Sequence, residues 1–331
     1  MSPDDFDFDL PEALIAQHPP EVRGDSRMLV VNRADQTIEH RHFSDFPSYL
    51  NPQDRLILND TRVVPARYFS NDGRIELLRL EQIAPCRWKS LVKPGKRMKL
   101  GRTVEIGNAT GTVVEILPAG GERVIEWDTE PDESTYGHLA LPHYIDREAA
   151  KADSERYQTT YAKHSGAIAA PTAGLHFTPE LLQTIPHSFV TLHVGLGTFR
   201  PVSADLVEDH VMHSEHYTLG RSTITDIEST RAAGGKVTAV GTTVVRVLES
   251  CAAQTVDGAL RPQTGDTDIF IYPPYEFRAV DQLLTNFHLP KSTLMMLVSA
   301  LAGRDLIAEA YRQAVTEKYR FYSYGDCMLI R

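Results

Sequence analysis

The sequence predicts a mixed α/β protein with a small antiparallel β-barrel inserted into its larger domain. From residue 136 onward, helix and strand signals alternate, which is typical of an α/β layer structure. Between residues 63 and 127, short alternating runs are instead separated by turn signals such as Asn71-Asp72-Gly73, as in a small barrel or sandwich. We therefore expect an α/β domain over 1–62 and 136–331 and an inserted β-barrel domain over 63–135.

The composition is that of a soluble globular protein. Of the 331 residues, 42% are hydrophobic and 24% are charged, and no run of eighteen apolar residues occurs. The first residues are acidic where a signal peptide would be basic. The 3 cysteines are far apart, which argues against a disulfide framework or a thiolate zinc site. We expect a cytoplasmic protein without a membrane partner.

In chain order, the first elements are a short helix over 11–16 and buried strands over 28–31 and 56–58. The second strand runs directly into the polar residues 59–62, and loops at strand ends often carry ligand groups. An Asx-type turn capped by Asp60 is the alternative. The expected barrel strands cover residues 74–80, 88–92, 103–106, 111–117 and 123–127.

A basic segment lies within the expected barrel. The net charge of −10 argues against a nucleic-acid binder when the chain is taken whole. Residues 87–104, however, contain 7 lysines and arginines and no acidic residue. They form either the solvated faces of two strands or a surface that follows RNA phosphates. The second interpretation makes Lys93, Lys96, Arg97 and Lys99 candidate RNA-binding residues.

The C-terminal half contains the alternating strands and helices. Polar residues follow the predicted strands, and because the carboxyl ends of parallel strands share one edge, these loops could form one pocket. Those residues are Thr198, Thr242, Thr243, His288, Lys291 and Ser292. The expected strands cover 190–194, 236–240, 268–272 and 283–287, and the expected helices cover 223–233, 244–253 and an apolar stretch after Thr293.

Residues 169–178 are the most distinctive stretch. Small residues, Pro171, Gly174 and His176 precede a helix start at Thr178 and Pro179. Small side chains let a ligand approach the backbone closely, and a helix N-terminus favours electron-rich groups. The stretch is therefore either a binding loop that carries His176 or a tight solvent-facing loop.

Two further patterns suggest chemistry. His210, His213 and His216 lie close to Glu215, but on a helix the three rings would spread over roughly 120° and no zinc-protease motif is present. The second pattern, residues 241–249, places two threonines at a helix N-terminus, where a carboxylate or phosphate could bind. Motifs for a P-loop, a dinucleotide fold and a serine hydrolase are absent from the sequence.

Several long strings, in order, resemble the S-adenosylmethionine:tRNA ribosyltransferase-isomerase family of queuosine synthesis. The resemblance covers the chain from near the N-terminus to residue 330. Four positions depart from the family pattern. His143 replaces a proline and Val244 replaces a serine, while His216 replaces an aromatic residue and Cys327 replaces an alanine. The matching strings cover residues 59–67, 169–178, 191–201, 212–215, 241–250, 267–271, 285–293 and 324–326.

The resemblance implies transfer and isomerisation of the ribosyl group of S-adenosylmethionine onto an aminomethyl-deazaguanine at the wobble position of tRNA, with release of adenine and methionine. It implies a large barrel-like α/β domain with an inserted β-barrel, no metal, no tightly bound cofactor and a monomer. The partners would be S-adenosylmethionine, as ribosyl donor, and tRNA. A metal-dependent hydrolase using His210, His213 and His216, or a non-catalytic RNA-binding protein, are the alternatives.

Such a reaction needs a base for the ribose carbon next to the sulfonium and an acid for the departing adenine. Histidine suits both tasks near neutral pH. The catalytic candidates are His176, then His288 and His213, with Glu215 or Asp60 as orienting or basic carboxylates; the sequence does not assign the roles. The substrate-binding candidates are Arg62, Thr172, Gly174, Phe177, His193, Gly197, Thr198, Phe199, Thr242, Thr243, Arg246, Asn286, Lys291 and Ser292.

Overall fold

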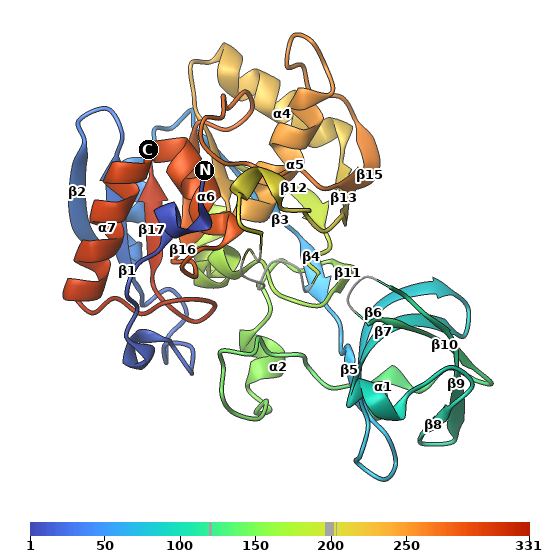
Figure 1. The fold of residues 1–331 in the computed structure, drawn as a ribbon. Coiled ribbons are helices and arrows are strands. Elements are labelled where there is room, and N and C mark those ends of the chain that lie inside the picture. The colour runs from blue at the N-terminus through green and yellow to red at the C-terminus, as the bar shows by residue number, and fades with distance from the viewer. Residues whose placement is uncertain (119–120, 196–201, 203) are drawn as a thin grey trace. The chain divides into compact units, whose positions relative to one another are not determined.

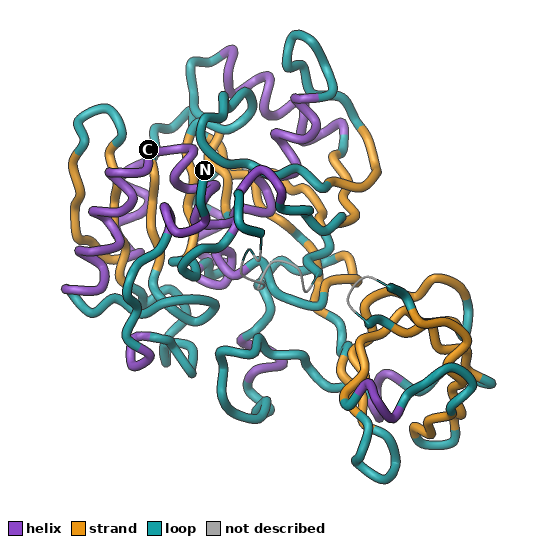
Figure 2. Tube along the Cα trace, viewed as in Figure 1, coloured by secondary structure: helices purple, strands orange, loops and turns teal. Residues whose placement is uncertain are grey.

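The computed structural model describes residues 1–118, 121–195, 202 and 204–331, and the chain divides into two compact units. The larger unit contains Met1–Arg62, His143–Arg147 and Glu155–Arg331. The smaller unit contains Val63–Pro142 and Glu148–Ser154. Figure 1 shows the larger unit as a layered α/β structure and the smaller one as mostly strands. Figure 2 colours the helices purple and the strands orange.

The larger unit is built on a mixed sheet whose hydrogen-bonded order, over the described residues, is β15-β13-β12-β3-β14-β16-β17-β1-β2. The four strands β12, β3, β14 and β16 are parallel to one another, so their carboxyl ends lie at one edge. The strands are β1 (Arg27–Asn32), β2 (Thr37–His42), β3 (Arg55–Asn59), β12 (His187–Leu192), β13 (Glu215–Leu219), β14 (Val237–Val240), β15 (Gln263–Thr267), β16 (Gln282–Asn286) and β17 (Cys327–Ile330).

Both faces of the central part of this sheet are buried, which explains why β1, β3, β14 and β17 read as apolar runs. Along β1, Leu29 and Val31 belong to one core, whereas Met28 and Val30 belong to another, as the alternation of side chains requires. The first core contains residues of α4 (Arg221–Ala232), α5 (Thr242–Ala253), α6 (Thr293–Ala302) and α7 (Arg304–Thr316). The second contains residues of η3 (Phe43–Tyr49), η5 (Thr172–His176) and α3 (Pro179–Gln183).

Two helix starts are capped by side chains: the cap at Thr178 was predicted from the sequence, whereas Ser292 was predicted as a ligand residue and not as a cap. Thr178 caps α3, since its hydroxyl accepts a hydrogen bond from the Leu181 amide at 3.2 Å. Ser292 caps α6 in the same way, by accepting from the Met295 amide at 3.1 Å. Short remaining elements of this unit are η1 (Pro3–Phe6), η2 (Glu12–Leu14), η7 (Val207–Asp209), and β4 (Thr61–Val63), which pairs with β11 (His164–Ala167).

The smaller unit is a nearly closed antiparallel barrel with the order β5-β6-β7-β10-β9-β8. Asn71 joins its two edges: its amide donates to the Glu105 carbonyl at 2.9 Å, and its side-chain oxygen accepts from the Gly107 amide at 2.7 Å. Tyr68, Trp88 and Trp127 lie in its core. The elements are β5 (Arg67–Phe69), β6 (Glu76–Ala84), β7 (Arg87–Lys93), η4 (Gly95–Arg97), β8 (Thr103–Ile106), β9 (Ala109–Ile116), β10 (Arg123–Trp127) and α1 (Glu133–Tyr136); α2 (Asp153–Arg156) follows.

The mixed α/β class with a small antiparallel barrel agrees with the prediction, but three expectations were wrong. The larger unit was expected to be barrel-like; over the described residues its sheet is open, with β15 and β2 as edge strands. The expected helix over 11–16 is only the short turn η2, and the expected strand over 268–272 is displaced, because β15 ends at Thr267. Among the described residues, no helix has the length and apolar character needed to cross a membrane.

Candidate active site

Several segments that are distant in sequence meet at the carboxyl edge of the parallel strands. The loops after β12, β14 and β16 reach this edge directly. Strand β17 runs antiparallel to β16, with Cys327 opposite Asn286, so the residues just before β17 come to the same edge. Strand β1 is parallel to β17, which also brings Ser26 there.

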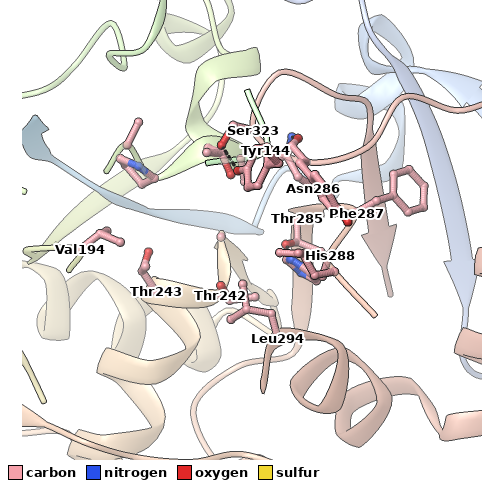
Figure 3. Close-up of a pocket in the computed structure, with 17 residues that line it drawn as sticks. Tyr144, Val194, Thr242, Thr243, Thr285, Asn286, Phe287, His288, Leu294 and Ser323 are labelled. Atoms are coloured by element: carbon pink, nitrogen blue, oxygen red, sulfur yellow. Dashed lines mark hydrogen bonds between the residues drawn. The ribbon is translucent and has the colours of Figure 1, made fainter. Parts of the chain in front are cut away.

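A cavity of about 60 Å³ lies at this edge (Figure 3). It is lined by residues 170–173, 241–243 and 285–289 together with Tyr144, Val194, Leu294, Tyr322 and Ser323.

The N-terminus of α5 points its first-turn groups at the cavity. Gly241 adopts φ 94°, a conformation that side chains disfavour, and thereby turns the chain from β14 into α5. The Thr243 hydroxyl accepts from the Asn59 side chain at 3.4 Å, whereas the Thr242 hydroxyl has no hydrogen-bond partner within the described part of the chain. A helix N-terminus with an available hydroxyl suits a carboxylate, a phosphate or a sugar hydroxyl.

His288 lines the same cavity as a buried, neutral imidazole. Its Nε2 lies 3.0 Å from the Thr285 hydroxyl, and its backbone amide donates to the Tyr311 hydroxyl at 3.0 Å. Burial lowers the pKa of His288 to about 3. His288 is therefore uncharged near neutral pH.

His176, at the end of η5, is also buried and neutral. Its Nδ1 lies 3.1 Å from the Ser26 hydroxyl, whereas its Nε2 has no hydrogen-bond partner among the described residues. Burial lowers the pKa of His176 to about 4, a side-chain hydrogen-bonding interaction with Asn286 opposes this shift, and the charges of Arg320 and Arg23 reinforce it. Asn286 therefore lies close to His176, although His176 Nε2 and Asn286 Oδ1 do not form a well-aligned hydrogen bond. An imidazole nitrogen without a partner can accept or donate a proton when a ligand reaches it.

His176 does not line the 60 Å³ cavity. It lines a smaller one of about 20 Å³, together with Arg156 and Tyr324. Ser323 lines both cavities, and Asn286, whose side chain influences His176, lines the larger one. The two candidate histidines therefore belong to neighbouring parts of one site.

The two buried histidines predict a loss of stability in acid. Each has an ordinary pKa of 6.5, lowered to about 4 for His176 and about 3 for His288, so the unfolded chain binds protons first. The free energy of unfolding should be highest above pH 6.5 and fall toward pH 4, by up to about 1.4 kcal/mol per pH unit for each histidine. Urea unfolding at pH 7 and pH 5 measures this. His288→Gln should flatten the dependence, and His18→Gln, at an exposed position, should not; equal slopes in both variants would contradict the prediction.

The residues after β3 make a hydrogen-bonded corner outside the cavity. Asn59, rather than Asp60, makes the Asx-type turn, since its side-chain oxygen accepts from the Thr61 amide at 3.1 Å. Asp60 accepts from the Thr191 hydroxyl at 2.6 Å. His193 Nδ1 lies 2.8 Å from the Thr61 hydroxyl, and Arg62 donates to the Ala162 carbonyl.

Glu215 and Arg246 form a buried ion pair with each other. Arg246 also donates to the Thr267 carbonyl at 3.2 Å, and Glu215 accepts from the Gly195 amide at 2.8 Å. Neither residue lines the 60 Å³ cavity. The pair holds the start of β13 to α5, so its contribution to the site is to position these elements.

Three more candidates have structural partners. Lys291 binds Asp4 at 2.7 Å and Asp7 at 3.1 Å, in the N-terminal segment. Ser292 is the α6 cap described above. Phe177 packs against Phe43 and Phe46 in the core.

The remaining candidates are divided among several surroundings. Thr172 and Asn286 line the cavity, and the Asn286 amide group donates to the Tyr322 carbonyl at 3.0 Å. Gly174 is buried where a Cβ would lie 2.1 Å from the Tyr161 hydroxyl, so no larger residue fits. His213 is exposed. The candidates Gly197, Thr198 and Phe199 lie outside the described residues.

The histidines 210, 213 and 216 do not share a helix. His210 directly follows η7, and His216 lies on β13, where its Nδ1 is 3.0 Å from Asp266. Over the residues with a described position, no group of three or more His, Cys, Asp or Glu side chains could hold a metal ion. The spacing of these histidines in the sequence therefore does not create a metal site.

The sequence did not point to Tyr144, Tyr322 and Ser323. The Tyr144 and Ser323 hydroxyls are 2.6 Å apart at the wall of the cavity, as the dashed line in Figure 3 shows. Phe287, by contrast, turns its ring away from the cavity and packs on Tyr311. The available signals for this wall were the family string at 324–326, directly beyond Ser323, and the family position 143, directly before Tyr144.

Comparisons with known proteins give one consistent result. The family model described as "Queuosine biosynthesis protein" matches residues 3–330. The S-adenosylmethionine:tRNA ribosyltransferase-isomerase of Symbiobacterium thermophilum is 51% identical, over 98% of each chain, and that of Moorella thermoacetica is 49% identical over the full length of both. The crystal structure of S-adenosylmethionine tRNA ribosyltransferase from Thermotoga maritima is similar with a TM-score of 0.57 and 37% identity, and covers 99% of this chain and 100% of that one.

Proposed function

The chain belongs to the queuosine biosynthesis protein family, and we propose on that basis that it is an S-adenosylmethionine:tRNA ribosyltransferase-isomerase. It transfers and isomerises the ribosyl group of S-adenosylmethionine onto the aminomethyl-deazaguanine at the tRNA wobble position. The products are the epoxyqueuosine nucleotide, adenine and methionine. Full-length identity near 50% to relatives that bear this name is the observation that carries the proposal.

The proton transfers fall to the buried histidines in this proposal. The sulfonium acidifies the neighbouring ribose carbon, so a neutral base near it can remove the proton, and an acid then protonates the departing adenine. His176 is the first candidate, because it is neutral and its Nε2 is without a partner among the described residues. His288 is the second, because it lines the cavity directly. His213 is exposed, and Asp60 and Glu215 have structural partners, so we rank them lower.

The threonines of α5 bind the donor in this proposal. The Thr242 hydroxyl and the first-turn amides suit the methionine carboxylate or the ribose hydroxyls. Thr242 lines the cavity of about 60 Å³ at the carboxyl edge of the parallel strands. Thr172 and Asn286 line the same cavity and are the further contacts we propose.

The smaller unit contributes an RNA-binding surface, and we propose that it acts as an inserted domain. Lys93, Lys96, Arg97 and Lys99 are all exposed, and the described residues offer none of them an ion-pair partner. Lys89 differs, because it pairs with Glu122 at 3.0 Å. Unpaired, exposed cations are available to phosphates, and each phosphate contact adds to the salt dependence of binding.

Reversing the charge of this segment should weaken tRNA binding. For Lys96→Glu with Arg97→Glu, we expect tRNA affinity to fall at least tenfold at low salt and the plot of log K against log salt to become flatter by about two. Fluorescence anisotropy over a salt series measures both. Arg74→Glu is the matched control, since Arg74 is exposed on the same unit outside the segment. An unchanged slope would support the alternative interpretation, in which the segment is a solvated surface that does not contact RNA.

Turnover tests the proposed function itself. Adenine and methionine should be released from S-adenosylmethionine only when the tRNA carries the aminomethyl-deazaguanine base, and the tRNA should gain the ribosyl-derived group. The same tRNA with an unmodified guanine is the control. RNA binding without release of adenine would contradict the proposal. We further propose that the enzyme acts as a cytoplasmic monomer without a tightly bound cofactor; light scattering and mass spectrometry of the purified protein test the last two points.

A further inference from the structure

We propose that a cationic pocket on the larger unit binds a phosphate group of the tRNA substrate; this inference rests on the proposed function. The pocket has a volume of about 340 Å³ and is separate from the two cavities described above. Its walls include Asp25, Ser26, Arg27, Lys318, Arg320 and Asp326.

The pocket lies at the sheet edge that carries the candidate active site. Arg27 begins β1 and Asp326 directly precedes β17, and the amino ends of these two strands lie beside the carboxyl end of β16. Ser26, in the pocket wall, is hydrogen-bonded through its hydroxyl to His176 Nδ1 at 3.1 Å. A phosphate in this pocket would thus be one side chain away from His176.

The charges of the pocket favour an anion. Arg27, Lys318 and Arg320 are positive in a protein whose net charge is −10. Asp326 is only 3% exposed, accepts hydrogen bonds from the amides of Arg27 at 3.0 Å and Arg320 at 2.8 Å, and has its Oδ1 3.7 Å from Arg320 Nη2. It therefore offsets the charge of Arg320, and Arg27 and Lys318 are the cations of the pocket without a carboxylate partner among the described residues. Asp25 is exposed, and its negative charge opposes the binding of an anion. Removal of that charge should therefore strengthen RNA binding, whereas removal of a cation should weaken it.

The Arg27 side chain is fixed by two contacts that place its guanidinium in position to bind a phosphate. Its guanidinium lies 3.8 Å above the centre of the Tyr319 ring, and one nitrogen donates to the Glu317 carbonyl at 2.6 Å. A guanidinium fixed in this way, beside the Tyr319 hydroxyl, binds phosphate with little loss of freedom. Lys318 adopts φ 55° just beyond α7, and its ammonium has no carboxylate partner in the described ranges.

A structural role for the same cations makes a different prediction. Cations near the C-terminus of α7 also stabilise that helix through its dipole. If that were their whole role, charge changes in the pocket would alter the unfolding temperature and leave RNA affinity unchanged. Measurements of both quantities therefore separate the two explanations.

Three single variants of the full-length protein test the proposal by anisotropy with tRNA at several salt concentrations. Lys318→Glu should raise Kd at least fivefold at low salt and flatten the salt slope by about one. Asp25→Asn should lower Kd, because it removes the opposing charge. Lys236→Glu is the control: Lys236 is exposed, and it precedes β14 at the opposite edge of the sheet, so Kd should stay the same.

Several outcomes would overturn the inference. These are an unchanged Kd and slope in Lys318→Glu, an equal effect in Lys236→Glu, or a raised KM for S-adenosylmethionine with normal RNA binding. The last result would assign the pocket to the other substrate. Failure of the proposed function is distinguishable, because it would abolish adenine release in the unaltered protein while the effects of these variants on RNA binding could still be measured.

Discussion

Replacing His176 by alanine is expected to lower turnover at least tenfold, with tRNA binding close to normal. The reason is that a positioned acid or base contributes roughly 10²–10⁴-fold to rate, whereas RNA affinity comes mainly from cations elsewhere. His176 is buried, neutral and has its Nε2 without a partner in the described part of the protein. Adenine release under saturating S-adenosylmethionine and tRNA measures the turnover, and anisotropy measures the binding.

Two further variants make this result specific. His187→Ala should retain turnover, because His187 begins β12 at the opposite edge of the sheet and its ring contacts the Ile185 carbonyl. Ser26→Ala removes the hydroxyl at His176 Nδ1 and should move the pH profile of turnover, whereas Ser26→Thr should restore it. Unchanged turnover in a folded His176→Ala protein would remove His176 from the catalytic candidates and leave His288 as the first.

Breaking the buried pair between Arg246 and Glu215 is expected to cost the protein about 3–5 kcal/mol of stability. In Arg246→Leu, the Glu215 carboxylate keeps its buried position but loses the guanidinium that balances its charge. The hydrogen bonds of Arg246 to the Thr267 and Ile269 carbonyls are lost as well. Urea unfolding followed by circular dichroism measures the free energy of unfolding.

The double variant Arg246→Leu with Glu215→Leu is the appropriate control. Since it removes both charges together, it should recover much of the lost stability. A loss below about 1 kcal/mol in Arg246→Leu would contradict a structural role for the pair. In that case the prediction from the sequence that Arg246 is a substrate-binding residue would gain support.

The position of the cavity could be predicted from the sequence, because it depends on a rule of topology. Polar residues after strands β14 and β16 were expected at one edge, and Thr242, Thr243 and His288 line the cavity there, whereas Lys291 and Ser292 do not. Turn signals between short runs similarly predicted an antiparallel barrel in the smaller unit. Both predictions use only local periodicity and the direction of neighbouring strands.

The partners of individual side chains could not be predicted in this way. Lys291 follows β16 as expected, yet it binds Asp4, which is 287 residues away in sequence. Phe177 was a substrate-binding candidate but packs in the core. The composition of a loop does not determine which of its side chains turn inward, because packing against distant segments decides this.

The sequence by itself therefore determined the family, the α/β class with its small barrel, and the strand ends at which polar residues gather. These features follow from motifs, side-chain periodicity and turn chemistry, which are local properties of the chain. Only the tertiary structure decided that His176 contacts Ser26 across 150 residues, that Glu215 pairs with Arg246, and that burial keeps His176 and His288 neutral. The physical reason is that desolvation and pairing depend on which segments the fold brings together, and a linear sequence does not specify those neighbours.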